Sequence, residues 1–327
     1  MERIALIYDG GILYWSSVIV TMAVLSAICS FLCLYLRQSE NTAACVVVIP
    51  LAFALSLLLS RLLYWYAYTE SFNSLWHALA DYSTGGFVLL GAFVGCPLAA
   101  VLTEMLGLHR DTPKILDCMC LSGGAAISVG RLSSVFNASA RGQIISAPHN
   151  FPWISPVVNA VSGVTEYRLA TFLLQASVTG IITASLLLHH SKRNQHYKDG
   201  DTALLFLLCY CASQIVLDST RYDSIFFHRN GFISIVQVSA AITMVIVIAL
   251  LSLRMVKTHG LRLWHLLILA KMTLLLGIAG YMEYYVQRHG DRPMLAYVIM
   301  SLCLFAVIVF TLVIYHYGRQ SNKQKRT

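Results

Sequence analysis

Long apolar segments alternate with short polar ones along almost the whole chain. Nine of the apolar stretches approach or exceed the roughly 20 residues that a helix needs to cross a bilayer. They lie at residues 11–36, 43–68, 82–107, 113–137, 166–190, 201–220, 232–254, 262–284 and 294–316. Because they are continuously apolar and do not alternate residue by residue, they exclude a transmembrane β-barrel. The pattern predicts an all-α, polytopic integral membrane protein with about nine transmembrane helices.

The composition agrees with this prediction. Hydrophobic residues make up 57% of the 327 residues and charged residues only 12%, whereas soluble domains carry about 25% charged residues. The first apolar stretch is too long for the core of a signal peptide, so we predict no cleavable leader.

Nine cysteines all lie in the apolar stretches. The pairs Cys118/Cys120 and Cys209/Cys211 are spaced so that the two side chains point in different directions on a helix. We interpret them as small buried residues. The sequence therefore predicts no metal site and no cofactor.

The positive charges predict an orientation in the membrane. If all nine stretches span, thirteen Lys and Arg lie in the loops of one side and seven in the loops of the other. The positive-inside rule places the first side in the cytoplasm, with the N-terminus outside and the C-terminus inside. Because this orientation explains the net charge of +8, we predict no nucleic-acid partner.

A few charged residues lie in or at the ends of the apolar stretches, where a charge usually faces a polar cavity. Arg61 and Arg131 are each about 10 Å below the outer ends of their stretches. Asp218 and Arg221 lie at the outer boundary of a third stretch, with Gln214 one turn deeper on the face of Asp218. We therefore predict a shared polar pocket that opens to the outer leaflet. The alternative is that each arginine snorkels to its own interface.

The stretch that carries Arg131 differs from the others in its small residues. Mostly Ser, Gly and Ala occupy positions 122–130, and small residues let neighbouring helices approach closely. We predict that this helix lies inside the bundle, which argues against snorkelling for Arg131.

The longest of the three main breaks between stretches, 138–165, contains Pro148, Pro152 and Pro156. Three closely spaced prolines exclude a continuous helix there. Together with Trp153 they suit a segment that rests at the membrane–water interface, on the outer side by the orientation above. A plain connector is the alternative.

The residues around Arg131 resemble a family signature. The stretch Gly130-Arg131-Leu132-Ser133-Ser134-Val135-Phe136-Asn137-Ala138-Ser139-Ala140-Arg141-Gly142 is similar to the pattern Gly-Arg-x-Gly/Ala-Asn-Phe-x-Asn-x-Glu-x-x-Gly of bacterial prolipoprotein diacylglyceryl transferases. The matching residues are Gly130, Arg131, Asn137 and Gly142, with Ser133 as a small substitute. The departures are Ser134, Val135 and Ser139, which stand in place of Asn, Phe and Glu.

Further segments resemble the family in the same order. Residues 60–64 are similar to its Ala-Arg-Leu-x-Tyr segment, with Arg61 at the arginine. Residues 85–91 are similar to Gly-Gly-x-x-x-His-Gly, with Leu90 at the histidine. Residues 214–221 resemble Arg-Phe-x-x-Glu-Phe-x-Arg, with Gln214 and Asp218 at the first arginine and the glutamate. In the first stretch, Ser16 stands where the family has a tyrosine.

The resemblance covers roughly residues 10–255 and implies a domain organisation. We expect a transferase-like membrane core at 1–255, with 138–165 as its outer loop. Two additional transmembrane helices would follow at 256–317, and a basic cytoplasmic tail at 318–327.

The resemblance also implies a function. The family transfers a diacylglyceryl group from phosphatidylglycerol to the lipobox cysteine thiol of an exported prelipoprotein, at the outer face of the bacterial cytoplasmic membrane. The implied partners are phosphatidylglycerol or a similar anionic phospholipid, the prelipoprotein signal peptide and membrane lipid. Catalytic roles would fall to Arg131, Asp218 and Arg221. Substrate-binding roles would fall to Arg61, Asn137, Gly142, Gln214 and His149.

The departures from the family pattern leave alternatives open. His77 and His149 lie on the predicted outer side and are candidates to replace the missing histidine. A second hypothesis is a non-catalytic lipid- or lipoprotein-binding membrane protein derived from the family. A small-solute transporter has less support, because the chain shows no duplicated halves and no paired broken helices.

Overall fold

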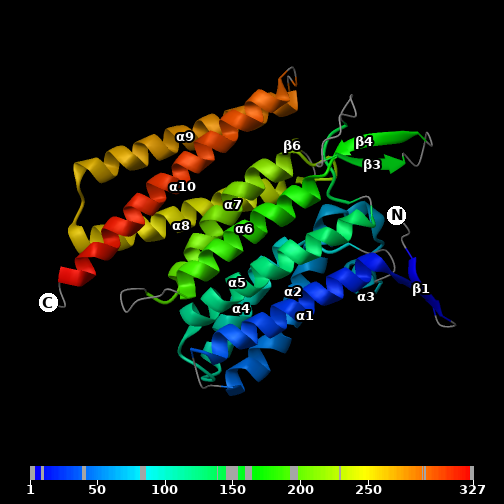
Figure 1. The fold of residues 1–327 in the computed structure, drawn as a ribbon, viewed down its shortest axis with the longest axis horizontal. Coiled ribbons are helices and arrows are strands. Elements are labelled where there is room, and N and C mark those ends of the chain that lie inside the picture. The colour runs from blue at the N-terminus through cyan, green and yellow to red at the C-terminus, as the bar shows by residue number, and fades with distance from the viewer. Residues whose placement is uncertain are drawn as a thin grey trace.

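A computed structural model describes residues 4–8, 11–38, 42–81, 86–137, 139–144, 154–158, 164–191, 198–227, 230–288, 290 and 292–324. Its main elements are helices that run side by side along the long axis of the molecule (Figure 1). These are α1 (Trp15–Leu36), α2 (Thr42–Ala67), α3 (Leu75–Ala80), α4 (Leu90–Met105), α5 (Thr112–Arg131), α6 (Thr171–Ser191), α7 (Asp201–Ser219), α8 (Ile235–His259), α9 (Leu263–Arg288) and α10 (Pro293–Gln324).

Eight of the described helices are long and apolar enough to cross a membrane. The prediction of an all-α polytopic membrane protein is therefore confirmed. The third predicted stretch, 82–107, is not among these eight; it contains α4, a shorter apolar helix of 16 residues. The fifth stretch was placed too early, because residues 165–169 form a strand and α6 begins only at Thr171.

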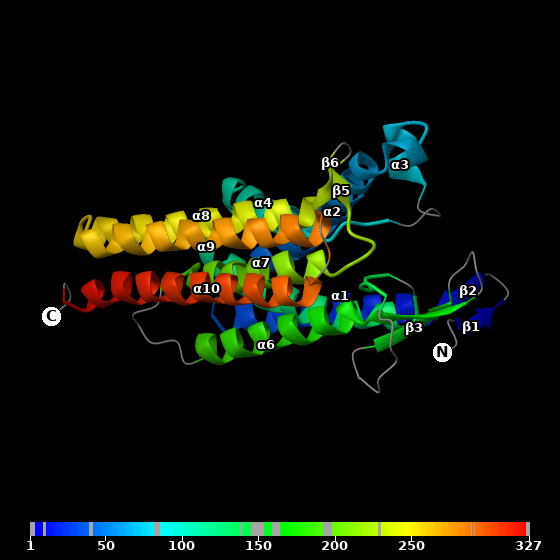
Figure 2. The same ribbon diagram turned by 90° about the horizontal axis from the view of Figure 1, so that it is seen from above.

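Three two-stranded antiparallel hairpins add to the helices. They are formed by β1 (Ile4–Tyr8) with β2 (Gly11–Tyr14), β3 (Ile154–Val158) with β4 (Thr165–Leu169), and β5 (Phe226–Phe227) with β6 (Asn230–Ser234). All three lie at the same end of the bundle as the short helix α3, and the C-terminus lies at the opposite end (Figures 1 and 2). The two ends of the bundle therefore differ in structure.

Helix α5 lies in the interior of the bundle, as its small residues predicted. It packs against α1, α4, α6 and α7. A Cβ atom added to Gly124 would lie only 2.3 Å from Thr183 Oγ1 and 2.6 Å from a ring carbon of Phe206. The close approach of α6 and α7 therefore depends on a residue without a side chain. This packing holds Arg131, the last residue of α5, next to α7.

Helix α4 lies directly on the backbone of α2. The contact uses Gly91 and Gly95, which are one helical turn apart. A Cβ atom at Gly91 would lie 2.1 Å from Ser60 N, and one at Gly95 would lie 2.6 Å from Ser56 N. Such Gly-xxx-Gly spacing is a common way for membrane helices to pack closely. It places the start of α4 beside Arg61.

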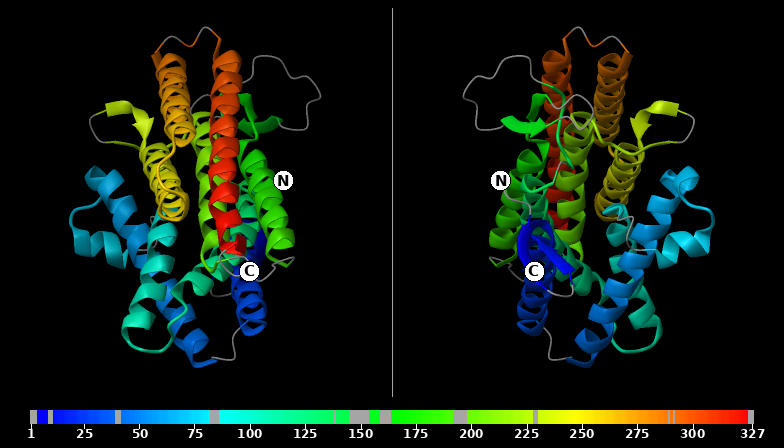
Figure 3. Two further views of the ribbon diagram at one scale, coloured as in Figure 1. Left: turned by 90° about the vertical axis from the view of Figure 1, so that its left-hand side faces the viewer. Right: turned by 90° about the vertical axis from the view of Figure 1, so that its right-hand side faces the viewer.

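Helices α9 and α10 lie along one edge of the bundle, opposite α1, α2 and α4 (Figure 3). They pack against each other, and α10 also packs against α7 and α8. Their buried contact with α8 is apolar and includes Met244, Met255, Met272 and Met300. Helix α10 continues to Gln324, past residue 317, where the sequence placed the end of the last span.

Candidate functional site

The site is built around Arg131, where α5 ends beside α7. Its guanidinium lies near the neutral hydroxyl of Tyr210 on α7, which stabilises its charge. Asp218 and Arg221 lie close enough to act on it electrostatically. Within the described part of the chain, no carboxylate forms a salt bridge with Arg131. Arg131 is therefore a partly exposed cation whose partner is a neutral hydroxyl.

Asp218 is the buried acid of the site, only 1% exposed near the end of α7. Its Oδ1 lies 3.3 Å from Arg221 Nη1. Its Oδ2 accepts a short hydrogen bond from the hydroxyl of Ser234, the residue that caps the start of α8. Asp218 thus ties the end of α7 to the start of α8, and it fixes the position of Arg221.

Arg221 lies just beyond α7 and is held by two carboxylates. Besides Asp218, its Nε donates to Asp223 Oδ1 at 3.0 Å. Burial lowers the pKa of Arg221, but the hydrogen bond and charge of Asp223, followed by the charge of Asp218, outweigh burial and raise this pKa overall. Arg221 therefore stays charged, and its side chain is only 14% exposed.

The loop after α5 returns to this site. Gly142 forms a β-bridge with Arg221, and a Cβ atom at Gly142 would lie 2.8 Å from Leu169 Cβ and 2.9 Å from Thr220 O. The backbone of the loop can approach Arg221 this closely because position 142 carries no side chain. Asn137 closes a turn in the same loop, with its Oδ1 accepting from Ser139 N at 3.1 Å. Asn137 and Gly142 thus shape the wall of the site.

Arg141 in this loop is a buried structural residue that the sequence did not single out. Its Nη2 donates to Asn137 O at 2.9 Å, and its guanidinium lies over the ring of Phe172. Asp223 also holds the loop, since its Oδ2 accepts from Ala140 N at 2.8 Å. The loop and the segment after α7 are therefore locked together on both sides of Arg221.

Two buried glutamines lie one turn deeper than Asp218. Gln175 Nε2 on α6 donates to Gln214 Oε1 on α7 at 3.2 Å. Gln214 Nε2 and Gln175 Oε1 have no hydrogen-bond partner among the described residues. Unpaired buried polar atoms are costly, so these two atoms are available to a polar group that enters the site.

Tyr210 is a site residue that the sequence analysis missed. It precedes Gln214 by four residues, as Gln214 precedes Asp218, so all three lie on one face of α7. The same spacing could have revealed it, but tyrosines are common near membrane interfaces and this one did not stand out. The rings of Phe93 and Phe206 stack on Tyr210 and hold it in place.

Arg61 has a different set of partners. It is 2% exposed, and its Nε and Nη1 donate to Ala78 O at 2.6 Å and Gly86 O at 2.9 Å. Its Nη2 forms a short hydrogen bond to Asp81 O. The described contacts of Arg61 thus anchor the segment between α2 and α4, and none of them joins it to Arg131.

The structure describes one of the two histidines proposed as substitutes. His77 is exposed on α3 and contacts Phe72 beside Arg61. His149 lies outside the described residues. Leu90, at the family's histidine position, is the first residue of α4.

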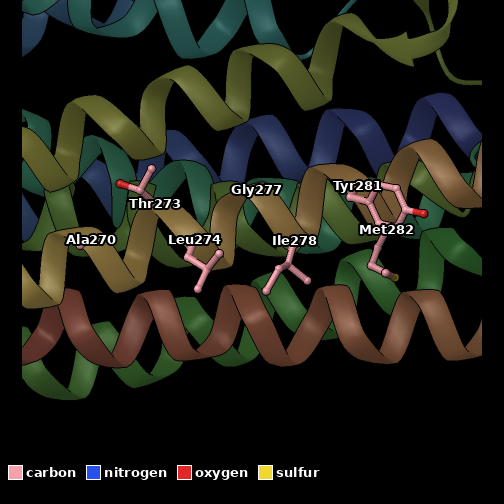
Figure 4. A pocket seen from close by; sticks show the side chains of 7 residues that line it. All are labelled: Ala270, Thr273, Leu274, Gly277, Ile278, Tyr281 and Met282. Atoms are coloured by element: carbon pink, nitrogen blue, oxygen red, sulfur yellow. The ribbon is translucent and has the colours of Figure 1, made fainter.

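A broad hollow of the surface has a volume of about 760 Å³ and runs along α9 (Figure 4). Its lining consists of Ala270, Thr273, Leu274, Gly277, Ile278, Tyr281 and Met282. An uncharged face of one transmembrane helix is ordinary lipid-facing surface, so we assign no site to it.

The fold and the site define a class of protein, a polytopic helical membrane protein with a cluster of arginines at one end of its bundle. Arginine forks suit the phosphate of an anionic lipid. The family model described as prolipoprotein diacylglyceryl transferase matches residues 4–253, and the chain belongs to this family of transferases. No curated protein sequence gave a significant match to the chain.

Proposed function

We propose that this protein transfers a diacylglyceryl group from phosphatidylglycerol to the lipobox cysteine of prelipoproteins. The observation that carries the proposal is Arg131, a cation at the end of a transmembrane helix that lies near the neutral hydroxyl of Tyr210 and forms no salt bridge with a described carboxylate. A cation in this position favours an anionic headgroup as its counter-ion. The family's known reaction supplies the rest of the proposal.

The chemistry assigns a role to each member of the cluster. A carbon–sulfur bond forms between the thiol and the diacylglyceryl group, and the carbon–oxygen bond to phosphate breaks, so that glycerol phosphate leaves. The proton that the thiol loses ends on this departing phosphate. Negative charge grows on the departing phosphate, where fixed arginine donors stabilise it. Arg131 would bind this phosphate, and Arg221, fixed by Asp218 and Asp223, would add to the positive field.

The deeper polar atoms would orient the lipid. Gln214 Nε2 lacks a described partner and lies one turn below Asp218. An amide donor at this depth can reach an ester oxygen of the lipid. Asn137 and Gly142 would act indirectly, by shaping the loop beside Arg221.

We further propose that the end with the three hairpins faces the outside of the bacterial cytoplasmic membrane. The loops on the side of the C-terminus hold thirteen Lys and Arg, and those on the side of the N-terminus hold seven. By the positive-inside rule, this difference favours an N-terminus outside and a C-terminus inside. Prelipoproteins present their lipobox at the outer face, so this orientation brings Arg131 to the side of the acceptor. In a variant without native cysteines, an impermeant thiol reagent should label H149C and miss Q195C; the reverse pattern would overturn the orientation.

A second candidate function is the binding of lipid or lipoprotein without transfer. It is favoured by Leu90, which stands where the family has its histidine, and by Ser139, which replaces the family's glutamate. A chain that had lost proton transfer but kept Arg131 would still recognise the headgroup.

Complementation separates the two functions. The full chain would be expressed in a bacterial strain depleted of its own transferase, and the modified prelipoprotein would be followed by its shift on gels and by mass spectrometry. Transfer predicts a diacylglyceryl thioether on the lipobox cysteine with the wild type and none with Arg131→Ala. A well-expressed wild type that binds phosphatidylglycerol but yields no thioether would support the second function.

A further inference from the structure

A second polar cluster lies at the end of the bundle opposite Arg131. It surrounds a narrow cleft between the start of α7, the end of α8 and the end of α10. The polar residues that matter here are Lys198, Asp201, Arg254, Tyr315 and Arg319. Asp201 and Asp218 lie at opposite ends of α7, about 26 Å apart at 1.5 Å per residue. The cleft is therefore separate from the site above.

The cleft is organised around one buried carboxylate. Asp201 is 5% exposed, and its Oδ1 lies 2.7 Å from Arg254 Nη1. Its Oδ2 accepts from the Tyr315 hydroxyl at 3.2 Å and from Lys198 N at 3.3 Å. These contacts join α7 to α8, to α10 and to the residue that precedes α7, so they give the cleft fixed walls.

Cations outnumber carboxylates among the described residues that line the cleft. Lys198, Arg254 and Arg319 carry positive charge there, and Asp201 carries negative charge. The side chain of Arg254 remains 41% exposed although it is paired, so it can be reached from outside. A narrow cleft that gathers cations from three segments attracts anions more strongly than the same charges spread over a surface.

The size of the cleft limits what can enter. Its volume is about 30 Å³, and about 10–15 Å³ holds one water molecule. Two oxygen atoms of a phosphate group would fit, with the remaining atoms outside. A bulky polar headgroup would not fit as a whole. The opening lies at the ends of α8 and α10, at the level where lipid headgroups meet a transmembrane bundle.

We propose that this cleft binds a phosphate-bearing anion through Lys198, Arg254 and Arg319. Two sources supply this chemistry, a phospholipid of the leaflet opposite the Arg131 site and a soluble phosphate. The family match ends at residue 253, so Arg254 and the α10 residues that line the cleft, Tyr315 and Arg319 among them, lie beyond it. Bound phosphate would therefore hold α10 against the matched part of the chain.

The test measures thermal unfolding of the purified full chain in detergent. The additions are sodium phosphate, water-soluble dihexanoyl phosphatidylglycerol, or sodium chloride at equal ionic strength. The variant K198Q/R319Q removes two cations and leaves the Arg254–Asp201 pair intact. The control K257Q/R262Q removes two cations that are exposed on the same end but do not line the cleft. If K198Q/R319Q fails to fold, K198Q alone replaces it, since the side chain of Lys198 is exposed.

We expect phosphate, the lipid or both to raise the unfolding temperature of the wild type by a few degrees beyond chloride. K198Q/R319Q should lose at least half of that rise, and K257Q/R262Q should keep it. A response to lipid alone identifies a phospholipid as the source, and a response to phosphate alone identifies a soluble anion. Equal rises in the wild type and K198Q/R319Q, or no rise beyond chloride, would overturn the proposal. Any lipid response that survives in K198Q/R319Q but disappears in Arg131→Ala belongs to the other site.

Discussion

Arg61 and Arg131 occupy similar positions in the sequence and very different surroundings in the fold. Both lie near the predicted outer ends of apolar stretches. Arg61 donates to three backbone carbonyls and is 2% exposed, whereas Arg131 is partly exposed and lies near the neutral hydroxyl of Tyr210. The depth of an arginine in a membrane protein therefore does not reveal its role. An arginine that already saturates backbone carbonyls holds the fold, and one with a single neutral partner is ready for an anion.

Replacing Arg131 should have the largest effect on function. We expect Arg131→Ala to abolish diacylglyceryl transfer in the depleted strain, because the headgroup phosphate loses its counter-ion. Arg131→Lys should recover only part of the activity, since an ammonium group lacks the planar fork of a guanidinium. Full activity of Arg131→Lys would contradict bidentate binding of phosphate by this residue.

Replacing Arg61 should have its largest effect on stability. Each hydrogen bond from a charged donor contributes about 1.5–3 kcal/mol, so Arg61→Ala should destabilise the protein by several kcal/mol. We expect a lower unfolding temperature and easier proteolysis between α2 and α4. The contrast between a structural Arg61 and a lipid-binding Arg131 would be wrong if Arg61→Ala unfolds like the wild type but binds no phosphatidylglycerol.

Asp218 and Arg221 should act as one unit with Arg131. Asp218→Asn and Arg221→Ala should each lower transfer by about tenfold or more, which corresponds to about 1.4 kcal/mol. The double variant should be little worse than either single variant, because each single change already breaks the pair. Fully additive losses would mean that the ion pair is an ordinary boundary contact worth at most about 1 kcal/mol.

Tyr210→Phe should have the smallest effect of the four. The variant keeps the aromatic stack with Phe93 and Phe206 and removes the hydroxyl that lies near Arg131. Such a polar contact to a charged group contributes at most about 1.5–3 kcal/mol, of which bound lipid would replace part, so we expect a severalfold weaker affinity for phosphatidylglycerol. An unchanged affinity in a lipid titration would show that Tyr210 does not position Arg131.

The sequence predicted the helices well because membrane spans depend on local composition. It also predicted that Arg131, Asp218 and Arg221 lie together, since helical depth and spacing fix their level in the membrane. It did not separate Arg61 from Arg131, because the carbonyls that bind Arg61 belong to Ala78, Asp81 and Gly86, which come near it only in three dimensions. The contributions of Ser234 and Asp223 were missed for the same reason. The hairpins were missed because β2, β4 and β6 overlap the starts of predicted stretches, so their residues were read as parts of spans.

The most direct test of the central claim measures phosphatidylglycerol binding to Arg131→Ala and Arg61→Ala side by side. Both variants would be made in the K198Q/R319Q background, so that the second proposed anion site does not contribute. Native mass spectrometry below the unfolding temperature of each variant would compare phosphatidylglycerol with phosphatidylcholine. The account predicts that Arg61→Ala keeps the preference for the anionic lipid and Arg131→Ala loses it. A preference that survives in Arg131→Ala would contradict the account.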